Sequence, residues 1–290
     1  MLRVLLTLLI GTMLVFAVPT SSEACSFNCD KSKNNRPLEF IKRKPSHSFD
    51  TYRLRNMLTL PVTDNTKIAV VILLHSCAGI TMKNQNDLVR WGDFLLKNGY
   101  GILGVDHLGP RNIKNNCGRG RRLGSTGLKK DVYKALKFLN DQPSIDKSRI
   151  FTLGFSLGAM TGGALASPDK YTAENKFPRL RAVAGLYGGC YPGESWLGSS
   201  GDIPVLWLVG GRDTESPPLS CGGAVSALKD KGLMTFHIYP DAGHCWDCAG
   251  LNGFTKSAGN GNVTTYKFDP DVTKDSEQRV LNFFNSFQSQ

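Results

Sequence analysis

The decapeptide Arg149-Ile-Phe-Thr-Leu-Gly-Phe-Ser-Leu-Gly158 joins an apolar segment to a sharp turn around a serine. Its first part predicts a buried strand over 149–154, and the Ala- and Gly-rich residues from Leu157 onward predict a helix. Glycines on both sides of Ser156 let the backbone turn sharply and lift the hydroxyl above the edge of a sheet. This context is that of a nucleophile elbow; a helix-capping serine among incidental glycines is the alternative.

Strands and helices alternate along the chain on both sides of this elbow. The run 68–75 is continuously apolar, as in a strand covered on both faces. Further strands are expected over 100–105, 180–187, 203–209 and 235–239, and further helices over about 88–96, 127–140, 224–231 and 280–287. The alternation predicts an α/β fold, with a doubly wound, mostly parallel sheet and helices on both faces.

Three segments are expected along the chain. A positive start, an apolar run over 4–18 and small residues before Cys25 predict a signal peptide over 1–24, cleaved near Ala24. Residues 25–50 are polar and basic and predict an arm without regular structure, and 51–290 predict a single α/β domain. Within it, 241–275 reads as a long Gly- and Asn-rich loop. We expect a secreted or periplasmic protein without a membrane span after signal removal.

The positive charge of the chain is concentrated in two clusters. The 290 residues carry 35 Lys+Arg and 24 Asp+Glu, a net charge of +11, and 41% are hydrophobic, as in a globular protein. Residues 31–55 hold eight basic and two acidic side chains, and 111–137 hold nine and one. No aromatic interleaving or nucleic-acid motif accompanies them, so no nucleic-acid partner is expected. A solvated face, an anionic substrate and an anionic polymer remain as explanations.

A serine hydroxyl becomes a nucleophile when a neutral imidazole takes its proton and a carboxylate orients that imidazole. His244 is the expected base, because it follows the last predicted strand and should lie at the same sheet edge as Ser156. Asp213 ends the preceding strand and is the expected carboxylate, ahead of Asp241 and Asp247 in the loop of His244. The order serine, aspartate, histidine, with gaps of 57 and 31 residues, is that of a hydrolase triad.

Acyl transfer also requires backbone N–H groups that face the developing oxyanion. The N–H of Leu157 comes with the elbow. The turn 74–79, Leu-His-Ser-Cys-Ala-Gly, follows an early strand, and the N–H of Cys77 within it is the second expected donor.

Residues 50–288 resemble the dienelactone hydrolase family of α/β-hydrolases. The resemblance rests on five stretches, which are 75–79, 106–111, 154–158, 211–217 and 239–244. It implies the α/β-hydrolase fold and hydrolysis of carboxylic esters or lactones through an acyl-enzyme, without a cofactor. It also matches Arg111 to a substrate-binding arginine of the family. The full set of expected substrate contacts is His75, Ser76, Arg111 and Trp246.

The chain departs from the namesake enzymes of that family at three positions. Ser156 stands where they use a cysteine nucleophile, and Ser76 stands where they carry a glutamate that restrains the thiol. Cys248 stands where they have a second substrate-binding arginine. The fold and the reaction type are therefore expected to carry over, whereas dienelactone as the substrate is not.

All eight cysteines follow the predicted cleavage site, and export favours disulfides. Cys77–Cys117 and Cys190–Cys221 would each join loops that follow strands, and similar pairings occur in secreted relatives of the family. The remaining four pair either locally, as Cys25–Cys29 and Cys245–Cys248, or between the arm and the loop. No metal is expected, because His244 and the two cysteines after it lack a complete ligand set.

These features predict an exported serine hydrolase for small carboxylic esters, lactones or thioesters, with a preference for anionic or polar substrates. A non-catalytic protein that binds an anionic polymer is one alternative. Thiol-disulfide exchange through Cys245 and Cys248 is the other, although that pair precedes a Gly-rich loop instead of opening a helix. The oligomeric state is left open.

Overall fold

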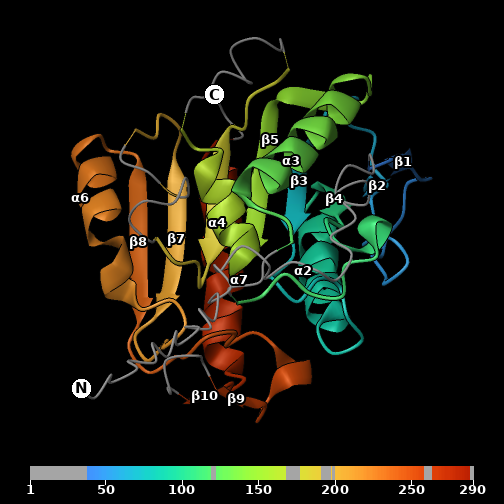
Figure 1. Ribbon diagram of the computed structural model, residues 1–290. Coiled ribbons are helices and arrows are strands. Elements are labelled where there is room, and N and C mark those ends of the chain that lie inside the picture. The colour runs from blue at the N-terminus through green and yellow to red at the C-terminus, as the bar shows by residue number, and fades with distance from the viewer. Residues whose placement is uncertain are drawn as a thin grey trace, which may run out of the picture.

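A computed structural model describes residues 38–118, 122–167, 177–190, 197, 200–257 and 263–287. Its centre is an eight-stranded sheet in the order β1-β2-β4-β3-β5-β6-β7-β8 (Figure 1). The strands are β1 Ile41–Lys42, β2 Met57–Thr59, β3 Ile68–Leu74, β4 Gly101–Val105, β5 Ile145–Phe155, β6 Ala182–Leu186, β7 Val205–Gly210 and β8 Met234–Tyr239. Neighbouring strands run parallel except β2 and β4, which are antiparallel.

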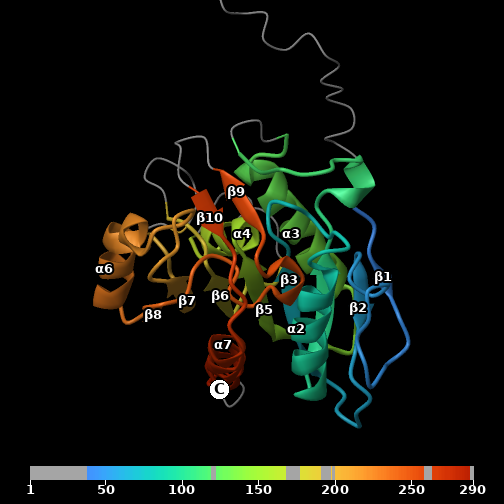
Figure 2. The same ribbon diagram turned by 90° about the horizontal axis from the view of Figure 1, so that it is seen from below.

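Helices cover both faces of this sheet. They are α2 Gln85–Lys97, α3 Ser125–Asn140, α4 Leu157–Ala164, α6 Gly222–Asp230 and α7 Pro270–Asn285. On β3, Val70, Ile72 and Leu74 pack into the core cluster that includes α3, α4 and α6. The alternate residues Val71 and Leu73 pack with α2 and α7 on the other face (Figure 2). A strand buried on both faces is apolar at every position, which explains the continuous run in the sequence.

The expected α/β-hydrolase fold, with a mostly parallel sheet between two helical layers, is confirmed. Two local expectations are wrong. The arm predicted over 25–50 contains β1, which pairs with β2 at the sheet edge. The loop predicted over 241–275 contains the short helix η3 (Ala249–Leu251) and a hairpin of β9 (Thr255–Ser257) and β10 (Val263–Thr265). Its last part is already α7, which begins at Pro270 because Asp269 caps the N–H groups of residues 271 and 272.

The predicted signal peptide over 1–24 and the predicted Cys25–Cys29 disulfide lie outside the described residues. Within the described part of the chain, none of the helices combines the length and the apolar character that a membrane span requires.

Candidate active site

Ser156 occupies the turn between β5 and α4, with φ 52° and ψ −112°. This positive φ is unusual for a residue with a side chain and is typical of an exposed nucleophile on an elbow. The flanking glycines are sterically required. A Cβ at Gly158 would lie 2.0 Å from the carbonyl oxygen of Leu74, and one at Gly154 would lie 2.3 Å from the carbonyl carbon of Gly158. The two glycines thus permit the close packing of α4 against β3 and β5 that raises the serine.

The three predicted triad residues meet at the carboxyl edge of the sheet. The distance from Ser156 Oγ to His244 Nε2 is 3.1 Å, and that from His244 Nδ1 to Asp213 Oδ2 is 2.7 Å. Asp213 Oδ1 accepts the backbone N–H groups of Glu215 and Ser216, each at 2.8 Å. Because a carboxylate can only accept, Nδ1 of the imidazole carries the proton and Nε2 is left to accept from the serine.

The imidazole of His244 is buried and has a raised pKa. Burial by itself lowers this pKa, but the charge and the hydrogen bond of Asp213 outweigh it, and the negative charge of Glu215 raises it further. Lys256 acts in the opposite direction. The geometry therefore combines a strengthened base with a hydroxyl at hydrogen-bond distance, as proton abstraction from serine requires.

The two expected oxyanion donors lie in turns at the carboxyl ends of β5 and β3. Leu157 is the first residue of α4. Its N–H lies in the first turn of the helix, where backbone N–H groups have no acceptor within the helix. Cys77 lies in the turn after β3. The carbonyl of Ser76, which shares a peptide group with the Cys77 N–H, accepts from the N–H of Gly79 at 3.0 Å and from His75 Nδ1 at 2.7 Å. Two donors on the carbonyl oxygen hold the plane of this peptide and hence the direction of its N–H.

His75 was expected to contact substrate, but both of its ring nitrogens are already used. Nδ1 donates to the Ser76 carbonyl, and Nε2 accepts the backbone N–H of His107 at 3.1 Å. Burial, together with the neighbouring His107, lowers the pKa of His75 to about 4, so the ring is neutral. The structure therefore makes His75 a support of the turn instead of a substrate ligand.

The structure does not support two further expected substrate contacts, because their polar groups are engaged within the protein. Arg111 is 3% exposed and forms a two-pronged ion pair with Asp131, at 2.9 and 2.7 Å. The hollow beside it, which Lys130 and Lys134 also line, includes neither a triad residue nor a chain neighbour of one. Trp246 is fully buried, and its indole N–H points to Ser276 Oγ at 3.5 Å. Neither Arg111 nor Trp246 lines the pocket described below.

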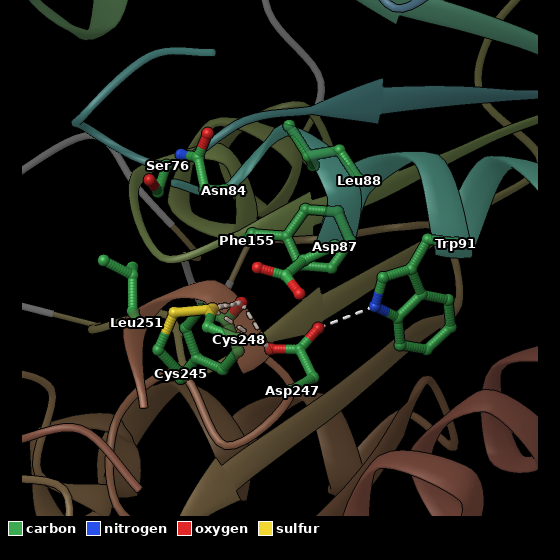
Figure 3. A pocket seen from close by; sticks show the side chains of 11 residues that line it. Ser76, Asn84, Asp87, Leu88, Trp91, Phe155, Cys245, Asp247, Cys248 and Leu251 are labelled. Carbon is green, nitrogen blue, oxygen red and sulfur yellow. Dashed lines mark hydrogen bonds between the residues drawn. A yellow bond between two sulfur atoms is a disulfide. The ribbon is translucent and has the colours of Figure 1, made fainter. Parts of the chain in front are cut away.

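A small pocket of about 30 Å³ is lined by Phe155 and Cys245, the chain neighbours of Ser156 and His244, although no triad residue lines it (Figure 3). Ser76, the fourth expected contact, lines it, so this expectation remains a proposal. The other walls come from α2, the end of β5, the residue after β6 and the segment after His244. They are Asn84, Asp87, Leu88, Trp91, Phe155, Tyr187, Cys245, Asp247, Cys248 and Leu251.

Three disulfides among the described residues brace this edge of the sheet: Cys77–Cys117, Cys190–Cys221 and Cys245–Cys248. The last pair was left open between local and arm-to-loop pairing, and the structure has the local one. Its cysteines are 7% and 5% exposed, which does not suit a thiol that must attack a partner. Asp247 lies within 4.8 Å of both sulfurs, but sulfurs joined to each other offer no thiolate to a metal.

The sequence reasoning missed the hairpin that supports the triad. Thr264 Oγ1 lies 2.6 Å from Thr214 Oγ1, and Lys256 forms an ion pair with Glu215 at 2.5 Å. Tyr266 packs against the ring of His244, with centroids 5.8 Å apart. The available signal was weak, since polar residues in a Gly- and Asn-rich stretch resemble a plain loop.

Asp87 is the second residue that was missed. It stands four residues before Trp91, on the buried stripe of α2, and is itself 7% exposed. A carboxylate on the apolar stripe of an amphipathic helix is the signal that would have singled it out.

Comparison with known proteins agrees with this architecture. The chain matches the dienelactone hydrolase family model over residues 54–288. A putative dienelactone hydrolase from Klebsiella pneumoniae has a similar structure, with a TM-score of 0.60 and 18% identity over 79% of this chain and 92% of that one.

Two curated relatives match shorter stretches. An α/β hydrolase domain-containing protein, WAV2, from Arabidopsis thaliana is 34% identical over 31% of this chain and 26% of its own length. Protein bem46 from Schizosaccharomyces pombe is 31% identical over 46% of this chain and 51% of its own length. The chain thus spans about a quarter and about half of these relatives. Since the family model covers most of the chain, the protein belongs to the dienelactone hydrolase family of α/β-hydrolases.

Proposed function

We propose that this hydrolase cleaves small carboxylic esters or lactones, and thioesters by the same chemistry, through an acyl-enzyme on Ser156. The observation that carries the proposal is the continuous chain of hydrogen bonds from Ser156 Oγ through His244 to Asp213, at 3.1 and 2.7 Å. In this mechanism the triad provides the nucleophile and the base, and two backbone N–H groups stabilise the oxyanion.

In the first step Ser156 Oγ attacks the carbonyl carbon while its proton passes to His244 Nε2. The N–H groups of Leu157 and Cys77 stabilise the oxyanion, and Asp213 stabilises the imidazolium. Collapse of the intermediate breaks the bond to the alcohol, which takes the proton from His244. Water then attacks the acyl carbonyl and loses a proton to His244. The bond to Ser156 Oγ breaks, Oγ takes this proton back from His244, and the acid is released.

We also propose that the chain is exported. The start of the chain, with the features of a signal peptide, and the three described disulfides support this. N-terminal sequencing of the protein recovered outside the cytoplasm tests it, with cleavage expected near Ala24 and retention of Met1 as the contrary result.

Labelling with a fluorophosphonate probe, followed by peptide mapping, tests the nucleophile. We expect the wild type and a Ser226→Ala control to be labelled at Ser156, because Ser226 is an exposed residue of α6 away from the site. Ser156→Ala should lose both the label and hydrolysis of p-nitrophenyl butyrate. An unlabelled but folded wild type, or a label that survives Ser156→Ala, would contradict the proposal and leave a binding function on a hydrolase fold.

A further inference from the structure

The wall of the pocket in Figure 3 includes the chain neighbours of three parts of the proposed machinery. Phe155 precedes the nucleophile Ser156, Cys245 follows His244, and Ser76 precedes the oxyanion donor Cys77. Tyr187, another wall residue, packs against the ring of His244, with centroids 4.9 Å apart. We therefore place the pocket beside a carbonyl carbon held between Ser156 and these N–H groups. If the proposed acyl-enzyme forms, the substituent on its carbonyl carbon is the part of the substrate that can enter.

Most of the pocket wall is apolar, but two carboxyl groups face each other inside it. Leu88, Trp91 and Phe155 form one side. Figure 3 shows the carboxyl groups of Asp87 and Asp247 close together between this side and the disulfide. Two acidic groups in an apolar surrounding are costly unless donors compensate for them.

Asp247 has its donors within the protein. The indole N–H of Trp91 donates to its Oδ2 at 2.6 Å, and the hydroxyl of Tyr187 donates to its Oδ1 at 2.9 Å. Arg90 adds an ion pair at 3.3 Å, while also pairing with Glu277. Asp247 is therefore held in place and fully occupied.

Asp87 is only half satisfied. Its Oδ1 accepts the backbone N–H of Ala249 at 3.1 Å, and the backbone N–H of Gly250 also stabilises the carboxylate. Its Oδ2 is buried and has no hydrogen-bond partner among the described residues. Burial, followed by the charge of Asp247, raises the pKa of Asp87 to about 6. At neutral pH the pocket thus holds an unmatched carboxylate oxygen and an excess of negative charge over the single guanidinium of Arg90.

We propose that this pocket binds a short acyl chain that ends in a hydrogen-bond donor, an ammonium or a hydroxyl group, which donates to Asp87 Oδ2. This inference rests on the proposed function and specifies the acyl half of its substrate. The apolar walls cover the methylene groups of the chain, and the volume of about 30 Å³ limits the substituent to a few atoms. An ammonium is favoured over a hydroxyl because the pocket is negatively charged, and a carboxylate is excluded for the same reason.

Three p-nitrophenyl esters with acyl chains of equal size test this inference: butyryl, 3-hydroxypropionyl and 3-aminopropionyl. We expect kcat/KM, corrected for the spontaneous hydrolysis rate of each ester, to rise in that order. The aminopropionyl ester should exceed the butyryl ester about tenfold or more, since its hydrogen bond is to a charged group. The malonyl half-ester, which carries a carboxylate, should be the poorest.

Asp87→Asn isolates the carboxylate from the shape of the pocket. We expect it to lower kcat/KM for the aminopropionyl ester about tenfold and to leave the butyryl ester within about twofold. Asp87→Leu should invert the order in favour of butyryl. Asp93→Asn is the matched control, because Asp93 lies on the same helix, pairs with Lys97 and does not line the pocket; it should keep the wild-type order.

The outcomes separate this inference from the proposed function. Hydrolysis of the butyryl ester at Ser156 with no preference among the three chains would overturn the pocket assignment alone. The same preference in Asp87→Asn as in the wild type would also overturn it. If no ester is cleaved and the probe does not label Ser156, the proposed function itself fails.

Discussion

At the scale of single residues, His75 shows how a buried side chain can govern a backbone donor. Its Nδ1–H holds the Ser76 carbonyl at 2.7 Å, and the other end of the same peptide group carries the Cys77 N–H. Loss of this hydrogen bond would let the peptide plane rotate. The proposed oxyanion donor would then have to be reoriented during the reaction instead of being fixed beforehand.

We therefore expect His75→Leu to lower kcat about 10- to 100-fold with little change in KM, because an oxyanion donor acts mainly in the transition state. His75→Asn should restore much of kcat, since its amide nitrogen can take the place of Nδ1. Steady-state kinetics on p-nitrophenyl butyrate check this. If KM rises while kcat holds, or if the two variants behave alike, His75 has no positioning role.

Asp87 allows a prediction for stability. Its pKa is about 6 in the folded protein, against an ordinary value of 3.8, so the folded state binds more protons between about pH 4 and pH 6. Its contribution to the free energy of unfolding therefore falls as pH rises through that window. Asp87→Asn should raise the free energy of unfolding by about 2 kcal/mol at pH 7 and by much less at pH 4.

Urea unfolding at the two pH values measures this difference, with Asp93→Asn as the control that should show no gain at pH 7. An equal gain at both pH values would mean that packing, and not the buried charge, is responsible. If Asp87→Asn stabilises the protein, the native aspartate reduces stability. This is expected of a residue that is retained for binding.

The meeting of the three predicted triad side chains could be foreseen because each was expected at the end of a strand at the same sheet edge. Ser156, Asp213 and His244 each follow a strand that the apolar runs already mark. Arg111 and Trp246 were misplaced because sequence distance from a strand end does not reveal burial. Whether the guanidinium of Arg111 contacts a substrate or pairs with Asp131 depends on the packing of α3, which carries Asp131.

At the scale of elements, the hairpin of β9 and β10 adds a smaller contribution to the electrostatics of His244 than Asp213 does. Its Lys256 pairs with Glu215. The negative charge of Glu215 raises the pKa of His244, and the positive charge of Lys256 lowers it. Because His244 must be neutral to accept a proton, kcat/KM should rise with pH through its raised pKa. The midpoint of this acid limb is expected above pH 6.5.

Two substitutions should move that midpoint in opposite directions. Glu215→Gln removes a negative charge, so the pKa of His244 falls and the limb moves to lower pH. Lys256→Met removes a positive charge, so the limb moves to higher pH. Each shift is expected to be about half a pH unit or less at these partly exposed positions. The pH profile of kcat/KM measures both, and shifts of the same sign in both variants would show that the hairpin acts through structure and not through charge.

The elements that the sequence analysis found and those that it missed differ in burial. Strands such as β3 are enclosed by helices, and their unbroken apolar sequence predicts them. β1, β9 and β10 have two or three residues each and are mostly exposed, so no alternation of apolar and polar residues marks them. Their pairing is decided by contacts with distant segments.

At the scale of the whole molecule, the described disulfides join loops at the carboxyl edge, where the site lies. Cys77–Cys117 spans 40 residues, whereas Cys245–Cys248 spans 3. A crosslink restricts the unfolded chain more when it closes a longer loop. The two bonds should therefore differ in what they contribute to stability.

Replacing Cys77 and Cys117 together by serine should lower the free energy of unfolding by about 4 kcal/mol, and the same change at Cys245 and Cys248 by about 2 kcal/mol. Guanidinium unfolding without reductant measures both. The second variant is expected to lose more of the preference among acyl chains, because its sulfurs line the pocket. The reverse order of stability losses would contradict the chain-entropy account.

The shortest strand of the sheet has a consequence for self-association. An edge strand offers unpaired N–H and C=O groups on which a second molecule can add a strand of its own. Here β1 ends after two residues, and Arg43, Lys44 and Pro45 follow it directly. The positive charges repel the same edge of a second molecule. Proline has no N–H to donate, so it prevents continuous hydrogen bonding to an added strand. We therefore expect part of the basic N-terminal cluster to disfavour edge-to-edge association of two molecules, independently of any ligand.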